Sequence, residues 1–245
     1  VSAMSEIAGN ASILIAAEYL SSSTNGRGQL FGGISGVSPT EVVILGAGMV
    51  GEYACKSALG LGAKIKVFDN NINKLRRLQT ELGRRIDTSV IQPGVLTKAL
   101  KNADVVIGAI SNKIGRSPII VTEEMVQKMK DGSVIVDISI DKGGCIETSE
   151  VTSHLKPTFI KHGVIHYCVP NIASRVARTA SNALSNVIMP TIVDTGEFGG
   201  VESMIKSYSG IQNGVYLYKG ILTNKYLAET FSLPYKDINL LLMAM

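Results

Sequence analysis

The chain has few of the residues on which disulfide-linked, metal-binding or nucleic-acid-binding proteins depend. Its 245 residues include three cysteines and three histidines, which are Cys55, Cys145, Cys168, His154, His162 and His166. The cysteines are odd in number and far apart, so they match neither a disulfide framework nor a zinc site. The histidines have no acidic partner at metal-ligand spacing. The net charge of +4 is scattered along the sequence, whereas a nucleic-acid-binding surface needs a concentrated basic stripe. We therefore expect neither a metal centre nor a nucleic-acid partner.

The sequence also lacks segments that would direct it to a membrane or out of the cell. It has no run of about 18 apolar residues and no recognisable signal peptide. Together with the unpaired cysteines, these absences predict a cytoplasmic protein with no membrane partner. The first residue is Val1 and not a methionine, so we expect a longer protein with a further segment before this one.

Apolar residues are abundant and follow a repeating pattern. They make up 45% of the chain, against 18% charged residues, which is enough for a substantial core. Strands are expected over residues 42–45, 65–68, 86–91, 104–110, 133–140 and 164–169. Amphipathic helices are expected between them, over residues 51–62, 73–82, a stretch ending at 98–102, and 122–130. This alternation is typical of a parallel sheet covered by helices on both faces. The predicted fold class is therefore α/β, a doubly wound parallel sheet of the Rossmann type.

Both ends of the chain depart from this alternation. Residues 5–20 have helical spacing, with Ser5 or Ser2 as the N-cap, and a Ser- and Gly-rich loop follows over residues 21–38. After residue 178 we expect a long helix, kinked or restarted near Pro190, and then another helix. An extended stretch over 213–220, a helix over 223–231 and an apolar tail over 240–245 complete the chain. We therefore predict a main domain over residues 1–177 and a helical segment over 178–245 from an incomplete second domain.

The most specific motif is a glycine-rich turn between the first expected strand and its helix, GAGMVG at residues 46–51. Gly46 permits a tight turn, Gly48 lets the backbone approach a pyrophosphate, and Gly51 lets helix and strand pack closely. The helix N-terminus directs its amides at the phosphates. Asp69 ends the next strand, where a carboxylate binds ribose hydroxyls and repels a 2′-phosphate. Domain 1–177 is therefore predicted to bind NAD in preference to NADP.

Polar residues follow the later strands, at the edge where such sheets bind ligands. Strand alternation would place Asp137, Ser139 and Asp141 on one face. Asp141 is the candidate catalytic residue, since it would contact the nicotinamide ribose or act on the substrate, whereas Asp137 is more suited to capping the loop. Asn171 follows the strand expected at 164–169, and it either reaches the cofactor or forms a plain turn.

Taken together, the motifs resemble the alanine dehydrogenase and pyridine nucleotide transhydrogenase family. The matching stretches are MSEIAG (4–9), VVILGAGMVG (42–51), LGAKIKVFD (61–69), TEEMVQKMKDGSVIVDISIDKGGCIET (122–148) and HGVIHYCVPNIASRVARTASNALSN (162–186). YKGILTNKYLAETFSL, at 218–233, is similar to the alanine dehydrogenase branch of the family.

The resemblance implies one catalytic residue and a set of cofactor contacts. Asp141 matches the family's active-site aspartate beside the nicotinamide. The implied cofactor-binding residues are Ser5, Gly46, Gly48, Met49, Gly51, Asp69, Lys74, Ile110, Ser111, Ile138, Val169, Asn171 and Ile172. The sequence departs from the family at Lys142, which is usually Gln, over residues 177–180, and at Ile91, where one member has a cofactor-contacting serine. None of these departures removes a catalytic group.

The resemblance also implies a reaction, the reversible NAD-dependent oxidation of L-alanine to pyruvate and ammonia by a homo-oligomer. The family's substrate-binding Arg and Lys and its catalytic His lie in a domain before the cofactor domain. The chain would then be the cofactor-binding portion, and segment 178–245 would belong to the absent substrate domain. Two alternatives are the NAD(H)-binding component of a proton-translocating transhydrogenase and a non-enzymatic NAD-sensing module. Which amino acid is the substrate depends on the absent domain.

Overall fold

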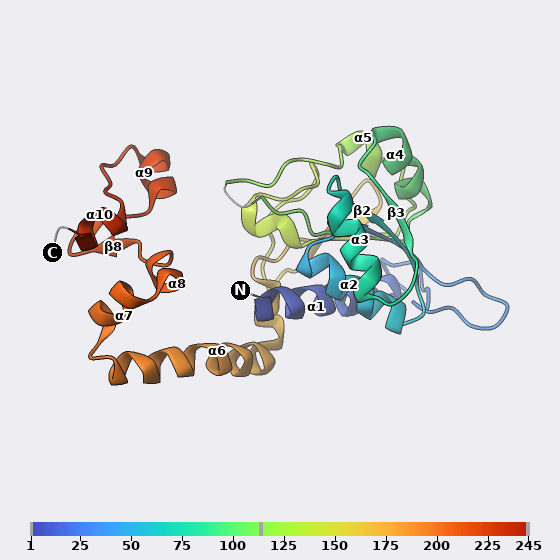
Figure 1. The fold of residues 1–245 in the computed structure, drawn as a ribbon. Helices are drawn as coiled ribbons and strands as arrows, with labels where there is room; N and C mark the ends of the chain where they lie inside the picture. The colour runs from blue at the N-terminus through green and yellow to red at the C-terminus, as the bar shows by residue number, and fades with distance from the viewer. Residues whose placement is uncertain (1, 113–114, 244–245) are drawn as a thin grey trace. The chain divides into compact units, whose positions relative to one another are not determined.

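A computed structural model describes residues 2–112 and 115–243 of the chain (Figure 1). The chain divides into two compact units, Val1–Ser181 and Asn182–Met245. The first contains the sheet and the glycine-rich turn, and the second is a small, mostly helical unit.

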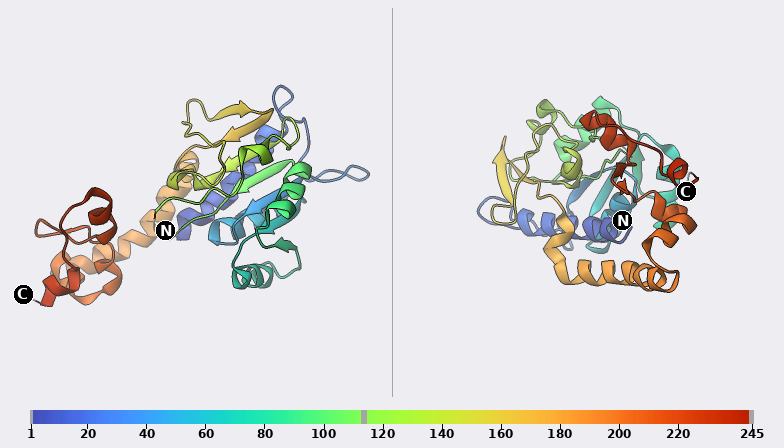
Figure 2. Two further views of the ribbon diagram at one scale, coloured as in Figure 1. Left: turned by 90° about the horizontal axis from the view of Figure 1, so that it is seen from above. Right: turned by 90° about the vertical axis from the view of Figure 1, so that its left-hand side faces the viewer.

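The first unit is built on a seven-stranded sheet. Its strands are β1 (Glu41–Leu45), β2 (Lys64–Phe68), β3 (Asp87–Ser89), β4 (Val105–Gly108), β5 (Val134–Asp137), β6 (Thr158–Lys161) and β7 (Val164–Tyr167). Their order in the sheet is β3-β2-β1-β4-β5-β7-β6. All neighbouring pairs are parallel except β6 with β7, which form the golden edge of the sheet in Figure 2. The chain therefore winds outward from β1 in one direction and then from β4 in the other, which confirms the predicted Rossmann-type fold.

Helices cover both faces of this sheet. Side chains from α1 (Ser2–Leu20), α2 (Met49–Gly60) and α3 (Ile72–Glu81) share one buried cluster. Side chains from α4 (Pro93–Asn102) and α5 (Glu123–Val126) share the other. Successive side chains of a strand point to opposite faces of the sheet and so pack in both clusters. In β1, Val42 and Ile44 belong to the first cluster and Val43 and Leu45 to the second.

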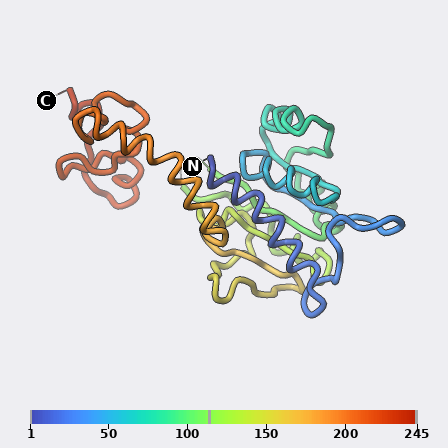
Figure 3. The backbone as a smooth tube through the Cα atoms, turned by 90° about the horizontal axis from the view of Figure 1, so that it is seen from below, coloured from blue at the N-terminus to red at the C-terminus, as the bar shows by residue number. Residues whose placement is uncertain are grey.

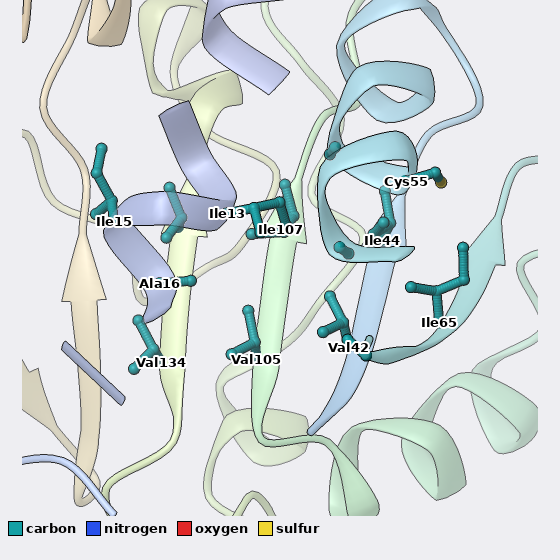
Figure 4. Close-up of a cluster of buried hydrophobic side chains, with 14 of the residues drawn as sticks. Ile13, Ile15, Ala16, Val42, Ile44, Cys55, Ile65, Val105, Ile107 and Val134 are labelled. Carbon is teal, nitrogen blue, oxygen red and sulfur yellow. The ribbon is translucent and has the colours of Figure 1, made fainter. Parts of the chain in front are cut away.

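Helix α1 precedes the sheet in sequence but packs across its middle. Figure 4 shows Ile13 and Ala16 of this helix close to Ile107 and Val134 of the central strands. Along its other side α1 lies against α2 (Figure 3). At Gly9 the two helices approach so closely that a Cβ atom would collide with the carbonyl oxygen of Val50. This glycine therefore brings the start of α1 next to the glycine-rich turn.

Strand β5 ends earlier than the sequence suggests, and this corrects one prediction. A short 3₁₀ helix, η1 (Ile138–Lys142), follows Asp137 directly. The buried Asp137 carboxylate accepts hydrogen bonds from the backbone N–H of Ser139 and of Cys145, both at 3.0 Å. The prediction that Asp137, Ser139 and Asp141 share a strand face is therefore wrong, because the chain no longer alternates after Asp137. The capping role suggested for Asp137 is confirmed.

Smaller differences concern the ends of elements. Of the two predicted N-cap residues, Ser5 lies inside α1 and Ser2 is the first residue of the helix, so neither is the N-cap. The helix expected over 122–130 is reduced to the single turn of α5. Strand β6 was not predicted, since its four residues lie in a stretch of turns.

The second unit has a small core of its own. Helix α6 (Ala177–Glu197) leads into it and continues through Pro190 without a restart. It is followed by α7 (Val201–Ser207), α8 (Ser209–Gln212), the hairpin of β8 (Leu217–Tyr218) and β9 (Ile221–Leu222), α9 (Lys225–Phe231) and α10 (Ile238–Met243). Its buried cluster consists of Ile205, Tyr218 and Ile238. In neither unit is any described helix long and apolar enough to cross a membrane.

Candidate cofactor-binding site

The glycine-rich turn has the geometry that a pyrophosphate requires. Gly46 has a positive φ of 108°, and a Cβ atom there would stand 2.5 Å from the carbonyl oxygen of Ala109. A Cβ atom on Gly51 would collide with the carbonyl oxygen of Gly46. At Gly48, by contrast, no atom lies within 4 Å of the Cβ position. Gly46 and Gly51 are thus required for packing, while Gly48 leaves open space at the N-terminus of α2, where helices bind phosphate.

Asp69 holds the turn in place. This residue ends β2 and is 7% exposed. Its Oδ2 accepts a hydrogen bond from the backbone N–H of Ala47 at 2.9 Å, and its Oδ1 accepts one from Asn71 at 2.8 Å. The half-exposed Lys74 places its Nζ 3.8 Å from Oδ2. Asp69 therefore fixes the backbone of the turn, a role that the sequence alone did not suggest.

A cavity of about 210 Å³ opens at the carboxyl ends of β4, β5 and β7. Predicted site residues that line it are Ser5, Ile110, Ser111, Ile138, Asp141, Asn171 and Ile172. They come from α1 and from the segments after three strands, so only the fold brings them together. The structure places the other predicted residues outside the cavity lining, namely Gly46, Gly48, Met49, Gly51, Asp69, Lys74 and Val169.

The cavity and the glycine-rich turn adjoin each other through two residues. Val50 belongs to the turn and also lines the cavity. Ala109 lines the cavity, and its carbonyl oxygen is the atom that Gly46 approaches. Together they form a continuous region along the carboxyl edge of the sheet, where ligands of doubly wound folds bind. Because pockets for whole ligands of drug size measure about 300–1,000 Å³, this cavity suits one end of a dinucleotide, and the turn suits the pyrophosphate.

Asp141 is tied to the loop that follows β7. Its Oδ1 accepts a hydrogen bond from the backbone N–H of Asn171 at 2.7 Å. Asn171 has a left-handed backbone, with φ at 51°. The residues that line the cavity with Asp141 are largely apolar, and they include Ile138 and Ile172. Asp141 is therefore an exposed carboxylate in the lining of a mostly apolar cavity.

Two features of the site were not predicted from the sequence. Arg175, in the short helix η2 (Ile172–Val176), forms an ion pair with Glu18 of α1 at 2.5 Å, and this ion pair ties the loop after β7 to α1. Lys142 lines the cavity and donates a hydrogen bond to the carbonyl oxygen of Asn112 at 2.7 Å. Neither contact has a local sequence signal, because its partners are far apart in the chain.

Two cysteines, Cys55 and Cys168, and the buried His166 are unsuited to nucleophilic or acid–base catalysis. Burial raises the pKa of Cys55 and of Cys168 to about 12, so both stay as thiols. His166 lies in β7, and burial lowers its pKa to about 4, which keeps the ring neutral. Among the described residues there is no group of three or more His, Cys, Asp or Glu side chains that would hold a metal ion.

The sheet order, the open position at Gly48 and the carboxylate at the end of β2 define a dinucleotide-binding domain of the Rossmann type. A family model described as "Alanine dehydrogenase/PNT, C-terminal domain" matches residues 12–225. The chain belongs to this family, whose C-terminal domain is the NAD(H)-binding domain, and its cofactor is accordingly NAD(H).

Similar proteins agree with this assignment. "Alanine dehydrogenase 2" of Staphylococcus aureus (strain USA300) is 41% identical over 239 residues, which are 97% of this chain and 64% of that protein. A solved L-alanine dehydrogenase has a TM-score of 0.89 at 38% identity, and the match covers 94% of this chain and 63% of the other. A transhydrogenase from Sinorhizobium meliloti shares the fold, with a TM-score of 0.71 at 22% identity over 91% of this chain and 60% of that one. The chain thus spans just under two thirds of the length of these alanine dehydrogenases.

Proposed function

We propose that this chain is the cofactor-binding portion of an NAD-dependent amino-acid dehydrogenase, with L-alanine, pyruvate and ammonia as its substrates and products. In this proposal, residues 178–245 belong to the substrate domain of the same enzyme, and the enzyme is a homo-oligomer. The similarity to proteins named alanine dehydrogenase supports the reaction. A cytoplasmic location stays a prediction.

One observation carries the proposal, namely the place of Asp141 at the cavity beside the glycine-rich turn. The glycine turn, Asp69 and Lys74 would hold the adenosine and pyrophosphate portions of the dinucleotide. Ser5, Ile110, Ser111, Ile138, Val169, Asn171 and Ile172 would hold the remainder. When bound, NAD supplies a nicotinamide ring that accepts a hydride from C2 of the amino acid.

Asp141 would act on the substrate's polar groups. The hydrogen bond from the Asn171 N–H fixes its Oδ1, while its Oδ2 has no hydrogen-bond partner among the described residues. That second oxygen would accept a proton from, or orient, the amine or the water that replaces it. A carboxylate in the lining of a mostly apolar cavity is suited to this role, since the apolar walls strengthen electrostatic interactions once bound substrate excludes water.

A second candidate is the NAD(H)-binding component of a transhydrogenase, which the family description also includes. In that case the hydride would pass to NADP on a partner and not to an amino acid. The 41% identity to an alanine dehydrogenase, against 22% to the transhydrogenase, favours the first candidate.

The test is an assay of NAD reduction by the enzyme to which this proposal assigns the chain, with a panel of small amino acids. The proposal expects reduction with L-alanine and none without an amino acid. The chain alone should bind NADH but show no turnover. Reduction of an NADP analogue by NADH, with no amino-acid dependence, would support the transhydrogenase instead.

A further inference from the structure

We propose that the chain has a second ligand site, for an organic phosphate of nucleotide size. It lies at the amino ends of the strands, whereas the cofactor site lies at their carboxyl ends. A hollow of about 800 Å³ lies where β1, β2 and β3 begin. It is bounded by Glu41 and Val42 of β1, Lys64 of β2, Asp87 of β3, and Val95 and Lys98 of α4. The cofactor region lies at the carboxyl ends of the strands, and five residues of β2 separate the two edges by about 15 Å. This inference is independent of the proposed reaction.

The hollow carries an excess of positive charge. Its lining has five cationic side chains, Lys64, Lys66, Arg84, Arg85 and Lys98, and two carboxylates, Glu41 and Asp87. Lys66 is paired with Asp87, with Nζ 3.0 Å from Oδ2. None of the other four cations lies within 4 Å of a carboxylate among the described residues. Four unpaired cations around one concave space repel each other, and a bound anion relieves that repulsion.

The shape and the apolar lining narrow the ligand class. The apolar wall of the hollow is formed by the partly exposed Leu59, Ile86 and Val95. Such a surface suits a flat or aliphatic body attached to a charged group. The guanidinium groups of Arg84 and Arg85 match the bidentate geometry of phosphate oxygens. The volume is within the range of small-molecule sites, about 300–1,000 Å³. A nucleoside phosphate combines these properties, whereas an inorganic ion would leave the apolar wall uncovered.

The test uses guanosine diphosphate as the probe, added to the chain already saturated with NADH. Saturation blocks the cofactor region, so calorimetry reports on any further site. We expect one guanosine diphosphate to bind per chain, more weakly as salt is added. Arg84→Gln and Lys98→Gln should each weaken binding by about tenfold, which corresponds to about 1.4 kcal/mol. Both side chains are exposed, so the Tm and the NADH affinity should not change.

The matched control is Lys101→Gln. Lys101 lies on the same helix α4 and is also exposed, but it does not line the hollow. It should leave guanosine diphosphate binding unchanged. If Lys101→Gln weakened guanosine diphosphate binding as much as Lys98→Gln, the effect would come from the overall charge of the chain, and the proposal would be overturned. Absence of binding would overturn it, as would binding that NADH abolishes. Binding of an oligoglutamate peptide without binding of guanosine diphosphate would replace it with a protein-docking site.

Discussion

Replacing Asp69 should do more than change the choice between NADH and NADPH, because this carboxylate also holds the glycine-rich turn. It accepts hydrogen bonds from Ala47 and Asn71 at 2.9 and 2.8 Å. Hydrogen bonds to a charged group are each worth about 1.5–3 kcal/mol. If the loss of one of these hydrogen bonds lowers the free energy of NADH binding by its full value, NADH affinity in Asp69→Ala falls about ten- to hundredfold. NADPH affinity falls less, because the repulsion of its 2′-phosphate is also removed.

Fluorescence titration of both cofactors measures these effects. The native chain should prefer NADH by about tenfold or more, equivalent to about 1.4 kcal/mol, and Asp69→Ala should reduce that preference. Asp69→Asn should be intermediate, because an amide oxygen can still accept one of the two hydrogen bonds. Glu124→Gln removes the same charge at an exposed site and serves as the control. Equal affinity of the native chain for both cofactors, or an unchanged preference in Asp69→Ala, would refute the reasoning.

Three further predictions address other parts of the chain. Gly51→Ala should lower the Tm because its Cβ collides with the Gly46 carbonyl oxygen, whereas Gly48→Ala should keep the Tm and weaken NADH binding; the reverse pattern would contradict the assigned roles. Burial lowers the pKa of His166 from 6.5 in the unfolded chain to about 4 in the folded one. Because the unfolded chain takes up this proton first, roughly 3 kcal/mol of the unfolding free energy should be fully present above pH 6.5 and lost as the pH falls toward 4. His166→Gln should flatten the pH dependence of the unfolding free energy over that window. The second unit exposes large apolar side chains such as Val201, Phe231 and Leu240, so the chain should self-associate, and a monomer at all concentrations in sedimentation would contradict this.

Much of the fold could be predicted because its signals are local. The glycine-rich turn, the apolar strands and Asp69 are each specified within a few residues, and the alternation of Val42–Leu45 between two layers follows from a period of two. The end of β5 could not be predicted in this way. The run VIVDISI (134–140) has apolar residues at every second position beyond the end of β5. The strand nevertheless ends at Asp137, whose buried carboxylate accepts hydrogen bonds from the N–H groups of Ser139 and Cys145.

The site could be predicted where a local pattern or a family motif pointed to it. Asp141 and Asn171 follow predicted strands, Ser5 lies in a stretch that resembles a known family, and the structure brings all three to one cavity. The ion pair between Glu18 and Arg175 has no such signal, since the two residues are 157 positions apart. The close packing of α1 on α2 at Gly9 likewise depends on tertiary structure. Long-range contacts of this kind follow from the arrangement of whole elements and not from any local pattern.

The most direct test of the account is the Asp141→Asn variant of the proposed alanine dehydrogenase, with kcat and the NADH Kd measured side by side. Asparagine retains an oxygen that can accept the hydrogen bond from Asn171 and removes only the charge. The account predicts that kcat for alanine oxidation falls about a hundredfold or more, while the NADH Kd changes by no more than a few-fold. An unchanged kcat with NADH binding abolished would contradict it and make Asp141 a ligand of the cofactor alone.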